Sequence, residues 1–242
     1  MGLFRSALDY LGAAGHWTGY DGILPLTLSH LKITLIAVLL AAAVGLTLGI
    51  ALGHARRGGA VVTVLANLTR AVPVLGLLAL LATNGSLGVT ATSAILALAV
   101  FAIAPILTNA YTGMSTVDPE TLEAASGLGM SGRQVLLGVE LPLALPLLAA
   151  GLRTAVLQVF ATATIASFVG ASTLGNLIAD GQATSSYDQV LAGAICIAVI
   201  AVILDLLLGA VQALVTPGTA NPLRRVADRR AAEPAEATAK LP

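Results

Sequence analysis

Three glycines near the middle of the chain have the spacing of a dinucleotide-binding loop. Gly127, Gly129 and Gly132 satisfy G-x-G-x-x-G, the pattern that lets a backbone approach a pyrophosphate at the start of a helix. That chemistry needs a strand before the glycines and an acidic residue about 20 positions later. Here helix-forming residues precede them, and the later position falls inside an apolar stretch. We therefore reject a dinucleotide site.

Side chains suited to phosphate or metal chemistry are sparse. The only lysines are Lys32 and Lys240, and neither follows the glycine that a G-x-x-x-x-G-K phosphate loop requires. The three histidines are scattered without the spacing of metal ligands. The apolar stretches contain no G-x-S-x-G, His-rich or paired-acid motif. The sequence predicts a chain that catalyses no reaction and binds no metal, cofactor or nucleotide itself.

Three charged residues lie inside long apolar stretches, where ion pairing is their expected chemistry. A lone charge there costs at least about 2.5 kcal/mol, so it is usually paired or faces water. At about 1.5 Å per residue, Arg70 and Asp205 lie about 15 Å deep and Arg153 about 10 Å deep. Asp205 can reach either arginine. We expect a pair that fixes helix register, in preference to direct contact with a substrate.

Several polar residues are candidates for lining a passage. They occupy the second and fourth apolar stretches and, with Arg70, are Asn67, Thr69, Gln158, Thr162 and Ser167. The alternative is that the hydroxyl groups bond only to carbonyls of their own helices. The sequence leaves both interpretations open.

The elements that must position these residues are membrane helices. The 242 residues are 57% hydrophobic and 10% charged, with mean hydropathy +0.93, whereas soluble domains are roughly 25% charged. Zero net charge removes the basic surface that nucleic-acid binding needs. A spanning helix takes about 20 apolar residues, which predicts an all-α integral membrane protein with five spans, at 26–52, 61–83, 91–108, 143–169 and 190–215.

Loop charges predict the orientation. Arginines follow the first, third and fifth spans, at Arg56, Arg57, Arg133 and in the segment 217–242. Because positive residues favour the cytoplasmic side, we expect the C-terminus inside and the N-terminus outside the cell membrane. Residues 1–25 are predicted to include an interfacial helix, and residues 217–242 a disordered cytoplasmic tail.

Gly45, Gly49 and Gly53 repeat every four residues in the first span. Such a ladder leaves one helix face as nearly bare backbone. We expect a second helix to pack closely on it.

The polar segment 109–142 separates the third and fourth spans and has helical signals. Asp118 is a good N-cap, Pro119 suits the first helical position, and Gly127 and Gly129 should end the helix. Ser131 should cap a second short helix that closes at Leu141 and Pro142.

The same segment resembles the EAA loop of binding-protein-dependent ABC importer permeases. Glu123, Ala124 and Ala125 are followed by Gly129 four residues after Ala125, and then by a V-x-L-P run that ends at Leu141 and Pro142. The family has isoleucine where this chain has Val139. Further runs at 109–113, 139–146 and 163–166 resemble the glycine betaine, carnitine and choline branch.

The resemblance implies a five-helix type I importer permease of the MetI-like kind. Its loop would form a coupling helix that docks on a cytoplasmic ATPase, with Glu123, Ala124, Ala125, Gly127, Gly129, Leu141 and Pro142 as the coupling residues. ATP and magnesium would belong to that ATPase. Further implied partners are a second permease subunit, identical or homologous, and an extracellular or periplasmic substrate-binding protein. The lipid bilayer surrounds the chain, and no nucleic acid takes part.

A secondary, ion-coupled transporter of a small polar solute is the alternative. Such carriers commonly have inverted repeats and acids at mid-membrane. Five spans do not divide into equal halves, and only Asp205 lies deep. These features favour the importer.

Overall fold

The structure, a computed structural model, describes residues 2–85 and 87–216, apart from the side chain of Arg70. Every regular element in those residues is helical. In chain order they are α1 (Gly2–Gly12), the 3-10 turn η1 (Ala14–His16), α2 (Ile23–His54), α3 (Gly59–Ala71), α4 (Val74–Ala82), α5 (Ala91–Ser115), α6 (Pro119–Gly127), α7 (Gly132–Val135), the π turn η2 (Leu136–Glu140), α8 (Leu141–Thr162), the 3-10 helix η3 (Ala163–Val169), α9 (Gly175–Ala183) and α10 (Tyr187–Val215).

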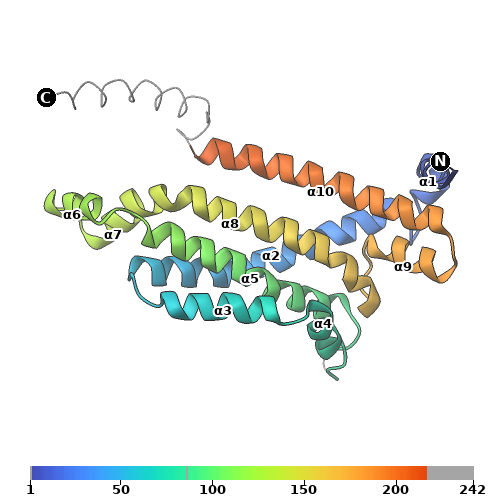
Figure 1. The fold of residues 1–242 in the computed structure, drawn as a ribbon, viewed down its shortest axis with the longest axis horizontal. Coiled ribbons are helices and arrows are strands. Elements are labelled where there is room, and N and C mark those ends of the chain that lie inside the picture. Colours follow the sequence, from blue (N-terminus) through green and yellow to red (C-terminus); the bar gives the residue numbers. More distant parts are fainter. Residues whose placement is uncertain (1, 86, 217–242) are drawn as a thin grey trace, which may run out of the picture.

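The long helices lie side by side as an elongated bundle (Figure 1), with α5 in contact with α2, α3 and α8, and α10 packed on α8. By length and composition, four helices of the described residues are long and apolar enough to cross a membrane. They are α2, α5, the run Gly132–Val169 and α10; the bent pair α3 and α4 gives a fifth if it counts as one span. The all-helical membrane prediction therefore holds at four to five spans.

The second predicted span, 61–83, is two helices instead of one. α3 and α4 are bent by 76° at the break before Val74. Pro73 caps α4, and Val72 has the extended backbone (ψ 121°) that a residue before proline prefers. In Figure 1, α4 turns away from the axis of α3.

The third span is longer than predicted, because α5 continues to Ser115. The polar segment therefore starts after Ser115 and not at Asn109. Ala110, Gly113 and Met114 are buried, so tertiary packing keeps this turn helical although its composition is polar. Asn109 donates its side-chain amide to the carbonyl of Pro105 at 2.8 Å.

The glycine ladder packs against α5, which confirms its predicted role. A Cβ added to Gly49 would lie 2.6 Å from the Cβ of Ala110, and one added to Gly53 would lie 2.5 Å from the Cβ of Met114. Carbon atoms in contact normally lie about 3.5–4.0 Å apart. Only glycine allows the two helices to approach this closely.

The fourth span begins without the predicted helix end at Leu141 and Pro142. α7, η2 and α8 follow one another with no break. The N–H of Leu141 donates to the carbonyl of Leu136, five residues back, which makes a π turn. The wider turn accommodates Pro142, because in a regular α-helix a proline ring clashes with the carbonyl four residues earlier.

The two ends of the bundle carry different elements (Figure 1): α6 and α7 lie at one end, and α1 and α9 at the other. α1 packs on α10, where Tyr10 and Leu11 contact an apolar cluster that includes Ile23 and Leu174. The helix predicted near the N-terminus is therefore present, and its place at the membrane interface stays a prediction. The predicted tail, 217–242, lies outside the described residues.

His30 joins three segments near the α9 end. It is fully buried in α2, and its Nδ1 accepts a hydrogen bond from the backbone N–H of Leu174 at 3.2 Å. Nε2 therefore carries the hydrogen and donates to the carbonyl of Phe160 at 2.8 Å. This histidine is a structural link.

Candidate coupling surface and solute passage

The sequence around the polar segment folds locally as its capping residues require. Asp118 Oδ1 accepts from the N–H of Glu120 at 3.0 Å, and α6 begins at Pro119. α6 ends at Gly127, and Gly129 has a φ of +84°, a value that glycine adopts without strain. Gln134 Oε1 accepts from both the backbone N–H of Ser131 (2.7 Å) and its hydroxyl (2.9 Å). The predicted helix, turn and helix start is confirmed, whereas the second helix does not close at Leu141 and Pro142 but continues into α8.

We call residues 118–140 the coupling segment. Its exposed surface carries Glu123, Ala124, Gly127 and Gly129, and Leu128 between the two short helices is 86% exposed. Ala125 is buried on the inner face of α6. The segment therefore exposes small residues and one leucine, a surface that suits docking into a groove of another protein.

Leu141 and Pro142, the other two predicted coupling residues, lie apart from that surface at the start of α8. Leu141 packs against the cluster of Ala110, Met114 and Leu148. Leu141 thus attaches this end of the segment to the bundle, Pro142 beside it is exposed, and the coupling role of both residues stays a prediction.

Both ends of the coupling segment are attached near the end of α2. Arg56 Nη2 donates to the carbonyl of Val117, directly before the segment. His54 Nδ1 is bonded to Oε2 of Glu140, the last residue of the segment. Glu140 is only 1% exposed. His54 is the last residue of α2 and Arg56 lies in the turn that follows, so the entrance and exit of the segment are held to the same short stretch of chain.

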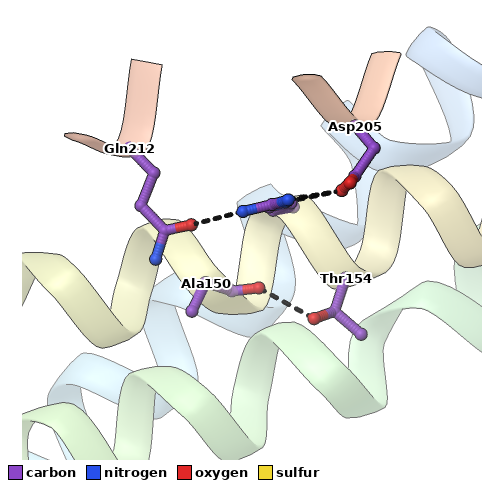
Figure 2. Close-up of polar contacts among 5 residues, drawn as sticks. Ala150, Thr154, Asp205 and Gln212 are labelled. Atoms are coloured by element: carbon purple, nitrogen blue, oxygen red, sulfur yellow. Dashed lines mark hydrogen bonds and ion pairs between the residues drawn. The ribbon is translucent and has the colours of Figure 1, made fainter. Parts of the chain in front are cut away.

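The intramembrane acid pairs with Arg153 (Figure 2). Asp205 Oδ1 lies 2.6 Å from Nη2 and 2.8 Å from Nε of Arg153, and Gln212 Oε1 accepts weakly from Nη1 at 3.4 Å. The pair joins α8 to α10. A Cβ added to Gly209 would lie 3.1 Å from Nη1, so the guanidinium rests over a glycine. The side chain of Arg70, the other predicted partner, lies outside the described part of the chain.

A polar cavity of about 100 Å³ lies where α3, α5 and α8 meet. It brings together two of the predicted passage residues, Thr69 and Gln158. Sequence reasoning missed the other polar residues on its wall, which are Thr108, Asn109 and Thr154. The span limit at Thr108 placed Asn109 in a loop. Asn109 reaches this wall because α5 continues about two turns beyond Thr108, where Ala110 and Met114 are buried.

The remaining passage candidates are not among the residues that line this cavity. Asn67 is exposed on α3. Thr162 donates to the carbonyl of Gln158 at 2.7 Å, and Ser167 donates to that of Thr164 at 2.9 Å. The sequence left open whether these hydroxyls line a passage or bond to their own helices, and for both of them the structure shows the bond within their own helical segment.

The comparison with protein families settles the class of the chain. The family described as "Binding-protein-dependent transport system inner membrane component" matches residues 45–220, which include the coupling segment, both of its attachments and the polar cavity. The chain belongs to this family. It is a permease component of a membrane transport system, and the match runs from the last third of α2 through the end of α10.

Curated relatives resemble the permease over most of its length. The glycine betaine/carnitine/choline transport system permease protein OpuCD of Bacillus subtilis is 40% identical over 189 residues, 78% of this chain and 82% of the relative. The OpuCB protein of the same system is 37% identical over 188 residues, 78% and 86%. The osmoprotectant import permease protein OsmW of Salmonella typhimurium is 34% identical over 195 residues, 79% and 91%.

Solved structures share the fold of the permease. A chain of the MetNI methionine ABC transporter in an inward-facing conformation gives a TM-score of 0.69 at 19% identity, covering 80% of this chain and 96% of that one. An amino acid ABC transporter with histidines gives 0.64 at 21% identity, covering 87% and 96%. The MetI-like fold expected from the sequence is therefore confirmed.

Proposed function

We propose that the permease is the membrane-spanning subunit of an ATP-driven importer of small quaternary-ammonium solutes of the glycine betaine, carnitine and choline class. Relatives that cover most of the chain carry these solutes in their names. The coupling segment is the observation that supports the ATP-driven mechanism best. It is largely exposed, helical, and held at both ends by the end of α2 and the turn that follows it.

The proposed topology has five spans, with α3 and α4 together forming a broken second span. The N-terminus is then outside and the C-terminus inside. Arg56 and Arg133 support this orientation, since Arg56 contacts the start of the coupling segment and Arg133 belongs to α7 within it. Positive residues favour the cytoplasmic face, so the α6 and α7 end of the bundle faces the cytoplasm.

The chain itself hydrolyses no ATP in this proposal. Two permease subunits, identical or homologous, each present a coupling segment to one cytoplasmic ATPase subunit, where ATP and Mg²⁺ bind. Closure of the ATPase pair moves both segments, and α8 and α2 carry this motion into the membrane. An extracellular or periplasmic binding protein delivers the solute to the opened passage.

Tight solute recognition belongs to the binding protein rather than to the permease. A quaternary ammonium is usually held in a cage of aromatic rings, and aromatic residues make up only 4% of this chain. The permease then supplies a gated passage of modest affinity.

Ala124→Arg tests this function, because a long charged side chain on the exposed face of α6 should block docking. We expect ATP-dependent uptake of glycine betaine to fall at least about tenfold, as losing about 1.4 kcal/mol of docking energy requires, while membrane insertion is unchanged. The matched control is Ala13→Arg, at an exposed alanine at the opposite end of the bundle.

Copurification separates the importer from the ion-coupled carrier. Recovery of an ATPase and a solute-binding protein with the wild-type permease, and loss of the ATPase from Ala124→Arg, supports the importer. Full uptake by the permease alone, driven by an ion gradient, would establish the carrier instead.

A further inference from the structure

We propose that two adjoining cavities between α3, α4, α5 and α8 form a transit site for a zwitterionic quaternary-ammonium solute. The trimethylammonium end would lie against Phe101, and the carboxylate end would face Thr108 and Gln158. This inference rests on the importer function proposed above and adds the place, orientation and charge type of the solute.

The two cavities share a wall. The first, of about 230 Å³, lies at the break between α3 and α4, and the second is the polar cavity of about 100 Å³. Thr69 and Phe101 line both. Sites for drug-sized ligands occupy roughly 300–1,000 Å³, so these volumes suit a solute of only a few heavy atoms.

The first cavity is apolar. Leu68, Val72, Leu77 and Val100 line it beside Phe101, with Thr69 as its polar member. A quaternary ammonium has no N–H to donate and spreads its charge over methyl groups, so it loses little by leaving water for such a wall. The face of an aromatic ring attracts it further. Phe101 is the aromatic residue that this wall offers.

The second cavity supplies a free hydrogen-bond donor. It is not Thr69 or Thr154, because these donate their hydroxyl hydrogens to carbonyls of their own helices, at 2.7 Å and 2.9 Å. The hydroxyl oxygen of Thr108 is buried and has no hydrogen-bond partner among the described residues. A buried hydroxyl without a partner is costly. A carboxylate that accepts from it removes that cost.

The side-chain amide of Gln158 faces the same space from α8. No hydrogen bond of this amide is found within residues 2–85 and 87–216, and Asn109 uses only one of its two amide hydrogens on Pro105. Three neutral donors on one wall match the two oxygens of a carboxylate.

Among the side chains that the structure describes, which leave out that of Arg70 beside Thr69, the walls of the two cavities contain no acidic or basic residue. A solute with a net charge would be desolvated there without a compensating charge, which is costly. The desolvation cost is lower for a zwitterion, because its ammonium end meets an aromatic face and its carboxylate end meets hydrogen-bond donors. The site therefore favours betaine and carnitine over choline, which ends in a hydroxyl.

The test uses the full importer in liposomes, with its ATPase and with binding protein saturated by solute, and measures Vmax for glycine betaine and for choline. Saturation removes the contribution of the binding protein, so Vmax reports the passage. Phe101→Leu should lower Vmax for both solutes about fivefold, the effect of losing one cation–π contact. Phe168→Leu, at a 66% exposed phenylalanine in η3, is the control.

Thr108→Val keeps the shape of the side chain and removes the donor. It should lower Vmax for glycine betaine about fivefold more than for choline, as the loss of one charge-assisted hydrogen bond requires. Thr108→Ser should restore the wild-type ratio, and Thr47→Val, at an exposed threonine of α2, should not alter it. The rescue by serine separates a lost hydrogen bond from a folding defect.

Unchanged Vmax for both solutes in Phe101→Leu, or an unchanged betaine-to-choline ratio in Thr108→Val, would overturn the transit site. In either case uptake by the wild-type importer would still support the proposed function. Absence of ATP-dependent uptake in the wild type would refute that function first.

Discussion

His54, the last residue of α2, bonds through Nδ1 to the carboxylate of Glu140, the last residue of the coupling segment and almost fully buried. The two residues are 86 positions apart in sequence. A second contact, from Arg56 in the turn after α2 to the carbonyl of Val117, holds the start of the segment. The coupling segment is therefore bound at both of its ends to the end of α2 and the turn that follows it, and it cannot swing freely about either one.

Replacement of His54 by alanine should loosen the exit of the coupling segment. Leaving a buried polar group without its hydrogen-bond partner costs about 1–3 kcal/mol, and Glu140 is almost fully buried although the His54 side chain is 43% exposed. We expect the thermal unfolding midpoint of the purified importer to fall by about 5 °C. ATP hydrolysis should continue while solute uptake per ATP decreases.

A second substitution tests whether the buried charge is the cause. His54→Ala combined with Glu140→Gln removes the charge as well as its partner, so the midpoint should recover part of the loss. A double variant that is less stable than His54→Ala by the full effect of Glu140→Gln alone would show that the two side chains are energetically independent.

Gly129→Ala should alter the turn between α6 and α7. A Cβ at this position meets nothing within 4 Å, so the effect comes only from its φ of +84°, which costs a residue with a side chain about 1–2 kcal/mol. Uptake should decrease about tenfold with insertion unchanged. Gly132→Ala is the control, because Gly132 is helical and equally open; equal effects of both variants would refute the role of the turn.

Gly49→Leu should separate α2 from α5. Its Cβ would lie 2.6 Å from the Cβ of Ala110 and 2.9 Å from the backbone carbonyl of Leu107, and such overpacking costs about 1–3 kcal/mol. The yield of monodisperse protein in size-exclusion chromatography should fall. Ala51→Leu, on an exposed face of the same helix, should leave the yield unchanged.

Asp205→Asn should remove the negative charge that balances the guanidinium of Arg153 and leave it with neutral acceptors only, the amide oxygens of Asn and of Gln212. An unpaired charge within the bilayer costs at least about 2.5 kcal/mol, so we expect less assembled importer in membranes. Arg153→Gln combined with Asp205→Asn should restore much of the assembly, and Asp180→Asn, at an exposed acid of α9, serves as the control. If Asp205→Asn assembled and transported normally, the pair would have no structural role.

The sequence predicted best those features that depend on neighbouring residues. Asp118 and Pro119 start α6, and Gly129 ends it, because capping and positive φ are local properties. The glycine ladder of α2 was equally readable, since its four-residue repeat can serve only a close helix contact.

Features that depend on tertiary contacts were missed. The break at Pro73 has a local cause and was missed for another reason, because the apolar residues on both sides were counted as one span. The length of α5 follows from the packing of Ala110 on Gly49, which no local signal reveals. The depth in the membrane estimated from the sequence allowed Asp205 to pair with Arg70 or Arg153. That it pairs with Arg153 depends on how α8 and α10 pack, which the sequence does not show.

The helix that runs without a break from α7 through the π turn into α8 carries both the coupling segment's second helix and one wall of the polar cavity. Val135 and Gln158 are separated by about 35 Å of helix at 1.5 Å per residue. In the proposed mechanism, a tilt imposed at α7 shifts the amide of Gln158 directly, so the ATPase contact and the transit site move together without an intervening loop.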